Sequence, residues 1–214
     1  MRLILLLFAL LFAVPEVRAQ NFDLPGLSND AEAWQRDLNR RFPAGATAPQ
    51  KAAAEQRAIQ AERTNNWAAA ATAWEERVAG GDPRPEHWLS LARAQLQKTP
   101  PDANRALQAA WLNFQVVPAG EPEIPSLLLM ADALQRLDRP AQQIQALNAV
   151  LERAPNNPRY RQLLTEARRA AGLMVARINT EAEAEPARFL VLNATDPIES
   201  IAAAVRDRVV GLLT

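Results

Sequence analysis

Cysteine is absent from the 214-residue chain, and histidine occurs once, at His87. Without cysteine there is no disulfide, no cysteine nucleophile and no thiolate metal site. A histidine-based metal site or catalytic triad would depend on His87 alone. Gly80-Gly81 is not followed by the Lys and Ser/Thr of a phosphate-binding loop. These absences argue against an enzyme, and we expect no cofactor and no metal ion.

An excess of one charge is also absent, because the chain has 24 Lys and Arg and 24 Asp and Glu. Surfaces that bind nucleic acid or anionic lipid usually need a basic excess, so we expect no nucleic-acid partner. Aromatic residues make up only 6%, whereas 49% of the chain is hydrophobic and alanine is abundant. Alanine has the highest helix propensity and lets helices approach closely. This composition favours a closely packed helical protein.

The first 19 residues have the pattern of a secretory signal peptide. Arg2 supplies a positive start, Leu3–Val14 is an apolar run too short to span a bilayer easily, and Pro15 ends it. We expect cleavage after Ala19 and therefore a periplasmic or secreted bacterial protein with no stable membrane insertion. The alternative is an uncleaved membrane anchor.

Residues 20–49 are expected to form a linker that contains a short helix. Asn29 and Glu32 have the spacing of a capping box. Four apolar residues then fall on one helical face: Ala31, Trp34, Leu38 and Phe42. Pro43–Pro49 shows no periodicity and is expected to be irregular.

Three helix pairs with apolar stripes at helical spacing are expected after Gln50. The first pair has Ala54, Ala58 and Ala61, and then Trp67, Ala70, Ala71, Trp74 and Val78 in a helix over Trp67–Ala79. The second pair, starting at Pro85, has Trp88, Leu91, Ala92 and Leu96, and then Ala103, Leu107, Ala110, Trp111 and Phe114. The third has Leu127, Met130, Ala131 and Leu134, and then Ile144, Leu147 and Leu151.

The connections between these helices have recognisable stop and start signals. Asn65-Asn66 is expected to be a turn, Thr99–Asp102 a capping box, and Pro118–Pro125 a long loop. Arg159–Ala171 has one apolar and one polar face, as a terminal capping helix needs. Gly172 is a natural helix stop.

The spacing of these pairs resembles that of tetratricopeptide (TPR) repeats. Ala70 and Ala106 are 36 positions apart, Leu127 and Arg161 are 34 apart, and the TPR period is about 34. The small, bulky and closing proline residues of the family pattern are matched by Ala70, Trp74 and Pro83, by Trp88, Ala92, Ala106 and Ala110, and by Leu127, Ala131, Leu147 and Pro155-Asn156-Asn157. Gln143 departs from this pattern. The resemblance implies an all-α fold, a TPR-like α–α solenoid of about three repeats plus a capping helix over 50–172; the alternative is a helical bundle with accidental spacing.

Residues 173–214 are expected to form a short mixed tail. Leu173–Ile178 and Phe189–Leu192 could be strands, separated by the acidic Thr180–Glu185. Asp196, Pro197 and Glu199 mark the start of an amphipathic helix over 197–213. This helix could dock onto the repeats or lie at a membrane surface, but its polar face lacks the basic excess that favours a membrane.

Residues before and within this tail also resemble the N-terminal region of bacterial alpha-2-macroglobulin-family proteins. The residues that match are Tyr160, Leu163, Gly172–Ile178 and Pro186-Ala187-Arg188. In that family a helical region precedes β-sandwich domains that trap proteases. The resemblance implies an alternative in which the chain is a truncated head of such a protease inhibitor. The thioester motif Cys-Gly-Glu-Gln is absent, so the chain could not trap a protease covalently.

The TPR resemblance implies that the first helix of each pair lines a concave surface. The residues expected to point into this groove are Ile59, Glu62, Arg63, Leu89, Arg93, Asp132, Gln135, Arg136, Glu166 and Arg169. Their mixed charge suits a peptide or protein partner that carries both signs. Trp67, Trp74, Trp88 and Trp111 lie on apolar stripes and are expected in the core, whereas His87, in the first turn of a helix beside Glu86, is expected at the surface. We therefore expect an exported, non-catalytic interaction scaffold.

Overall fold

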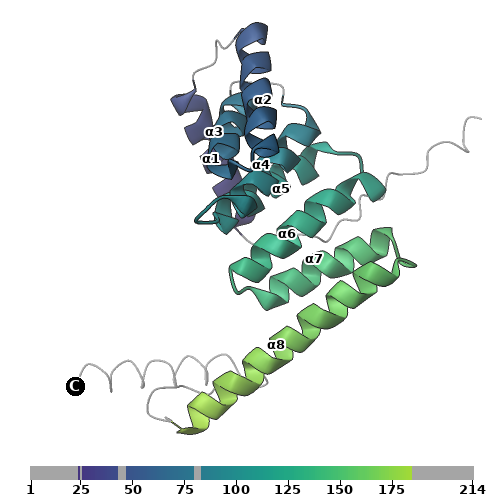
Figure 1. The fold of residues 1–214 in the computed structure, drawn as a ribbon. Helices are drawn as coiled ribbons and strands as arrows, with labels where there is room; N and C mark the ends of the chain where they lie inside the picture. Colours follow the sequence, from purple (N-terminus) through teal and green to yellow (C-terminus); the bar gives the residue numbers. More distant parts are fainter. Residues whose placement is uncertain (1–23, 25, 43–46, 80–82, 185–214) are drawn as a thin grey trace, which may run out of the picture. The chain divides into compact units, whose positions relative to one another are not determined.

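A computed structural model describes residues 24, 26–42, 47–79 and 83–184, and these residues form helices without any strand. The helices are α1 (Leu27–Arg41), α2 (Ala48–Arg63), α3 (Trp67–Val78), α4 (Pro85–Gln97), α5 (Ala103–Val116), the 3₁₀ turn η1 (Glu121–Glu123), α6 (Ile124–Arg136), α7 (Pro140–Arg153) and α8 (Pro158–Ala184) (Figure 1). The predicted all-α class is confirmed for these residues. The predicted signal peptide, the apolar run at 189–192 and the helix at 197–213 lie outside them.

Consecutive helices pack as pairs, which are α2–α3, α4–α5 and α6–α7 (Figure 1). Each pair also packs on the next through α3–α4 and α5–α6, and the first helices of the second and third pairs, α4 and α6, contact each other. Helix α1 packs on α5 and reaches α3, where Arg41 Nη1 lies 3.1 Å from Glu75 Oε2. The helix predicted within the N-terminal linker is therefore built into this group of helices.

Capping side chains determine where several helices begin. The N–H of Thr47 donates to Gln50 Oε1 at the start of α2, and Asp102 Oδ1 accepts from the N–H of Arg105 at the start of α5. Two predicted caps are therefore wrong: α5 begins after Asp102 rather than after Thr99, and α1 begins after Gly26 rather than after Asn29. The predicted irregular segment also ends earlier, since α2 already includes Ala48 and Pro49.

The turns of the first and third pairs have the same geometry. At the end of α2, the N–H groups of Asn65 and Asn66 donate to the carbonyls of Glu62 and Ala61. At the end of α6, the N–H groups of Asp138 and Arg139 donate to the carbonyls of Gln135 and Leu134 in the same pattern. Asn65 and Asp138 both have positive φ, at 55° and 57°. Both turns are therefore Schellman motifs with a left-handed residue just after the helix.

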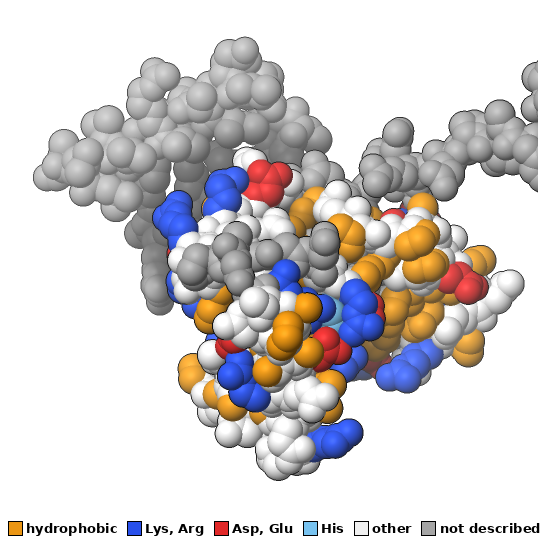
Figure 2. All heavy atoms as spheres, turned by 90° about the horizontal axis from the view of Figure 1, so that it is seen from above, with side chains coloured by type: hydrophobic (Ala, Val, Ile, Leu, Met, Phe, Trp, Pro, Cys, Tyr) orange, Lys and Arg blue, Asp and Glu red, His pale blue; other side chains and the backbone are white. Residues whose placement is uncertain are grey.

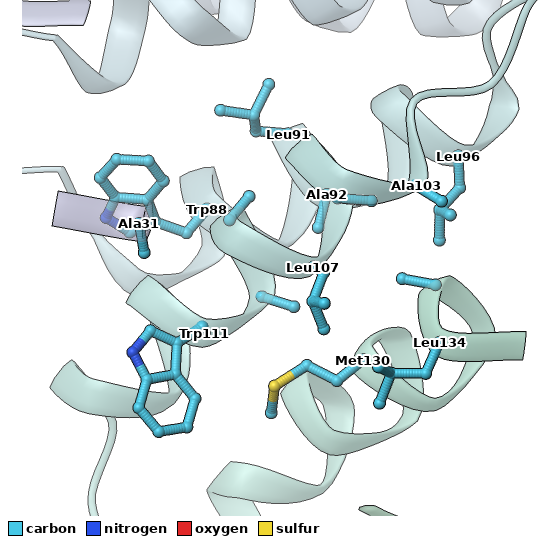
Figure 3. Close-up of a cluster of buried hydrophobic side chains, with 14 of the residues drawn as sticks. Ala31, Trp88, Leu91, Ala92, Leu96, Ala103, Leu107, Trp111, Met130 and Leu134 are labelled. Atoms are coloured by element: carbon cyan, nitrogen blue, oxygen red, sulfur yellow. The ribbon is translucent and has the colours of Figure 1, made fainter. Parts of the chain in front are cut away.

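Alanine and a few large side chains form the core. Ala58, Ala70, Ala92, Ala106, Ala110 and Ala133 are fully buried, so the helices approach closely at these positions. Leu107 of α5 lies near Met130 of α6, whereas Trp88 of α4 lies beside Ala31 of α1 (Figure 3). The predicted burial of Trp74, Trp88 and Trp111 is confirmed, while Trp67 is partly buried at the edge of the core.

Helix α8 continues well past the predicted stop. It runs to Ala184, so the strand predicted at Leu173–Ile178 is wrong and Gly172 does not end the helix. Leu, Met, Ala and Arg dominate this segment and favour a helix, and one glycine costs only about 1 kcal/mol. One compact unit ends at Ala167 and a second begins at Arg168, both within α8. The helix also removes the strand on which part of the alpha-2-macroglobulin resemblance depended.

Candidate functional site

The ten predicted groove residues are distributed over α2, α4, α6 and α8. Seven of them are exposed, namely Ile59, Arg63, Arg93, Gln135, Arg136, Glu166 and Arg169, and three are half-buried, namely Glu62, Leu89 and Asp132. Arg169 belongs to the second compact unit and is considered by itself. The remaining nine lie on the first helices of the pairs or on the part of α8 before Arg168.

The structure brings part of this set together where α4 meets α6. Arg136 donates from Nε to Asp132 Oδ1 at 3.0 Å and from Nη1 to the carbonyl of Leu96, near the end of α4, at 3.1 Å. Arg93, which is exposed, is three residues before Leu96 on the same helix. The ion pair of α6 is thus bonded to the backbone of α4 close in sequence to one predicted groove residue.

Other members of the set are engaged in local contacts. Glu62 accepts a hydrogen bond from Trp74 Nε1 at 2.7 Å, which fixes the indole ring against α2. Gln135 accepts from Gln143 Nε2 of α7 at 3.4 Å, and Glu166 accepts from Gln162 Nε2 of its own helix at 2.8 Å. Figure 2 shows a face on which basic, acidic and apolar side chains are interspersed.

A polar cluster that the sequence did not reveal joins the first and second pairs. It consists of Glu55 on α2, Trp74 and Arg77 on α3, and Arg84 and His87 at the start of α4, and we call it the His87 cluster. The Glu55 carboxylate lies 3.3 Å from Arg77 Nε, 2.8 Å from Arg84 Nη2 and 3.4 Å from His87 Nε2. Glu55 is 32 positions before His87, so no local sequence pattern predicts this contact.

His87 is buried rather than exposed as expected, with only 1% of the residue accessible. Its ring stacks on Trp74, with centroids 5.7 Å apart and planes at 27°. Its Nδ1 accepts the N–H of Arg84 at 3.1 Å, so the side chain folds back over the start of α4. The expectation failed because Glu55 of α2 and Trp74 of α3 cover the ring, and neither is close to His87 in the sequence.

Burial and neighbouring charges shift the pKa values of both acid–base groups in the cluster. Burial raises the pKa of Glu55, but the Arg77 hydrogen bond and the charges of His87, Arg84 and Arg77 outweigh burial and hold it below 4.5. Burial, and then the charges of Arg77 and Arg84, lower the pKa of His87 below 6.5 despite Glu55 and Glu86. The folded cluster therefore favours a carboxylate beside a neutral imidazole.

A second buried ion pair links the 118–125 loop to α7. Arg153 Nε donates to Glu123 Oε2, and the two side chains are 3% and 9% exposed. Glu123 Oε2 also accepts the N–H of Gly120 at 2.8 Å, and the Arg153 guanidinium lies 5.8 Å from the Phe114 ring centroid on α5. We call these residues the Arg153 cluster. It holds the long loop predicted between the second and third pairs.

Two open cavities lie away from the predicted groove residues. One, of about 520 Å³, is lined by Ser28, Glu32, Gln35, Pro83, Trp88, Trp111, Leu112, Gln115 and Val116. The other, of about 420 Å³, lies between α3 and the α4–α5 connection, with Glu75, Gln95, Lys98 and Asp102 among its lining residues. None of the ten predicted groove residues lines either cavity.

In the part of the chain that the structure describes, no three His, Asp or Glu side chains are grouped as metal ligands. Within the same residues, no helix has both the length and the apolar character needed to cross a bilayer. Comparisons of the chain with protein-family models, with curated proteins and with solved structures give no match.

Proposed function

We propose that the chain is an exported, non-catalytic scaffold that binds a protein or peptide on the first helices of TPR-like repeats. Three helix pairs packed in sequence are consistent with such an array. The Schellman turns at Asn65 and Asp138 support it further, because they are 73 positions apart, about two repeat periods. The second pair departs from the pattern, since Thr99–Pro101 lengthens its turn.

The observation on which the binding proposal depends is the contact between α4 and α6. Through it the Asp132–Arg136 pair bonds to the carbonyl of Leu96 on α4, three residues after the exposed Arg93. Helix α1 packs on α5, a second helix, and also contacts α4 through the rings of Trp34 and Trp88. A partner with both charge signs would match these side chains, while its affinity would depend on a few buried anchors.

Charge reversal at this contact tests the proposal. The variant Arg93→Glu/Asp132→Arg/Arg136→Glu should lose partners that the wild-type chain captures from a periplasmic or secreted fraction. The control Asp30→Arg/Arg36→Glu/Arg40→Glu makes the same change in net charge on exposed positions of α1. Because Arg136 also bonds to the carbonyl of Leu96, its replacement could affect folding. Circular dichroism of both variants checks that they fold. Capture of the same partners by both variants would contradict the proposed surface.

Export is a separate part of the proposal and depends on residues 1–19. Expression of the full chain in a bacterium should give a periplasmic or secreted product whose N-terminus begins at Gln20. N-terminal sequencing of the purified product measures this directly. A product that retains Met1 and fractionates with the membrane would favour the anchor instead.

A further inference from the structure

Two helices of this chain use the same cap with different chemistry. At α2 the third helical residue is Gln50, whose carbonyl oxygen accepts the N–H of Thr47 at 2.7 Å. At α4 the equivalent residue is His87, whose Nδ1 accepts the N–H of Arg84 at 3.1 Å. Glu and Gln are the usual residues at this position. His87 therefore places a nitrogen that can be protonated where a carbonyl oxygen normally lies.

The cap determines which nitrogen of His87 carries the proton. Because Nδ1 accepts from a backbone N–H, the neutral ring must carry its hydrogen on Nε2. Nε2 lies 3.4 Å from Glu55 Oε2, to which it can donate, and 3.0 Å from Arg84 Nη2. Arg84 Nε, 3.3 Å from Nε2, could donate to it only in the other tautomer, in which the backbone N–H of Arg84 would lose its acceptor. With hydrogen on Nε2, the guanidinium binds Glu55 Oε1 instead, at 2.8 Å. The imidazole and the guanidinium thus share one carboxylate.

Three helices meet at this ring. Glu55 faces it from α2, while Trp74 and Arg77 face it from α3. Arg84 and Glu86 are the charged groups next to it at the start of α4. Arg77, Arg84 and His87 all lie against the Glu55 carboxylate, and Arg84 also pairs with the exposed Glu86, at 3.2 Å. A second proton on the ring would therefore meet two guanidinium groups in a buried site.

We propose that His87 is an acid-sensitive lock between the first and second helix pairs, which protonation opens. Protonated Nδ1 becomes a donor and faces the N–H of Arg84, so the cap of α4 is lost. The new cation also stands beside Arg77 and Arg84, so that three positive charges face the Glu55 carboxylate and the solvent-exposed Glu86. The start of α4 then separates from α2 and α3. This inference does not depend on which partner, if any, the first helices bind.

The direction of the effect follows from the shift at His87. Burial and the two arginines lower its pKa in the folded protein, so the folded protein binds this proton less readily than the unfolded chain. The lock is therefore closed at neutral pH and opens as the pH falls below about 6.5, the ordinary value for histidine.

Because His87 is the only histidine, its ring can be followed in the wild-type chain by ¹⁵N NMR, provided that no histidine tag is present. At pH 7.5 we expect the tautomer with hydrogen on Nε2. As the ring titrates, we expect faster amide hydrogen exchange in the first turn of α4 and in the turns of α2 and α3 that face it. After correction for intrinsic rates, the exchange rate there should rise by about tenfold or more between pH 7.5 and 5.0. Exchange of α7 should not change.

The matched variant is His87→Gln, which restores the acceptor used at Gln50 and cannot be protonated. It should make exchange at the α2–α3–α4 junction independent of pH between 7.5 and 5.0. Gln50→His, which places a titratable cap at an exposed site, should leave that junction as sensitive as in wild type. The proposal is overturned if the ring titrates in wild type without a change of exchange at the junction, or if His87→Gln keeps the wild-type pH dependence.

Discussion

Asn65 and Asp138 are the two described non-glycine residues with positive φ, and each ends the first helix of a pair. An L-residue in this conformation costs about 1–2 kcal/mol, but Asn and Asp tolerate it because their short side chains bond locally. Two equivalent turns therefore depend on the choice of one residue each.

Substitution of Asp138 tests this dependence. Asp138→Val should lower the free energy of unfolding by about 1–2 kcal/mol, because a β-branched side chain fits poorly at positive φ. Asp138→Gly should leave stability unchanged or raise it, and Asp138→Asn should resemble wild type. Urea denaturation measures all three; equal stability of the Val and Gly variants would show that the turn is not under this constraint.

The Arg153 cluster gives a second prediction at the residue scale. Arg153→Ala leaves the buried Glu123 carboxylate without its partner and should lower the unfolding free energy by about 3–5 kcal/mol. The double variant Arg153→Met/Glu123→Gln removes both charges and should recover most of that loss. A double-mutant cycle in urea, completed with the single variants Arg153→Met and Glu123→Gln, measures the coupling, and additive losses would contradict it.

Single residues are predictable from sequence only where their role is local. The turn at Asn65-Asn66 could be predicted because such residues mark turns by themselves. The position of His87 could not, because its burial requires Glu55 on α2 and Trp74 on α3 to meet the start of α4. Likewise, Glu62 has the register of a groove residue, yet it bonds to Trp74 across the pair.

Helices whose start and stop signals agree were predicted well. The bounds of α3, α4 and α7 lie within one residue of Trp67–Ala79, of the start at Pro85 and of the start at Pro140. The predicted end of α8 is wrong because it treats Gly172 as a stop signal. A glycine ends a helix when the backbone turns to positive φ, and the positive-φ glycines described are Gly26 and Gly120 only.

Gly172 therefore offers a prediction about α8. A Cβ added at this position meets nothing within 4 Å, so Gly172→Ala should stabilise the helix by about 1 kcal/mol through propensity alone. Amide hydrogen exchange around residues 168–176 should slow by up to about fivefold. Faster exchange in the Ala variant would indicate that Gly172 does act as a hinge or stop. Ala171→Gly is the matched opposite change.

Helix α1 is predicted as a short element of a linker, but in the structure its apolar face is buried against other helices. Trp34 is 2% exposed, packs edge-on to Trp88 with centroids 6.4 Å apart, and lies 4.9 Å from the Arg105 guanidinium of α5. The stripe itself was predictable, whereas its partner was not, because nothing local identifies α5 as the surface it covers.

Truncation of Trp34 should therefore affect more than α1. Trp34→Ala should lower the unfolding free energy by about 3–5 kcal/mol, as for other buried tryptophans. Trp67→Ala, at a partly buried position, should cost clearly less and serves as the control. Chemical denaturation followed by circular dichroism compares them. If Trp34→Ala costs no more than Trp67→Ala, α1 is not part of the cooperative core.

At the scale of the molecule, apolar packing and buried charge have separate roles. Alanine lets the helices of each pair approach, but it supplies little that would select one arrangement of pairs over another. Buried polar groups lie at both junctions between pairs: the His87 cluster between the first and second, and the Arg153 cluster between the second and third. A buried charge without its partner costs more free energy than the ion pair contributes. An arrangement of the helix pairs that separates these partners is therefore destabilised.

The His87 cluster also makes the stability of the whole chain depend on pH in one direction. The pKa values of His87 and Glu55 are both lowered in the folded protein, so the unfolded chain binds more protons and acid favours unfolding. The Tm should be level above about pH 6.5, fall as His87 protonates below it, and fall again below about pH 4.5, where Glu55 begins to protonate in the unfolded chain. Each tenfold difference between folded and unfolded proton affinity removes about 1.4 kcal/mol, or about 3–6 °C of Tm in a chain of this size. Thermal unfolding at pH 7.5, 5.5 and 4.0 measures both steps, and His87→Gln should remove the first while it keeps the second. A Tm that rises between pH 7.5 and 5.5 would show that the cluster binds the extra proton instead of excluding it.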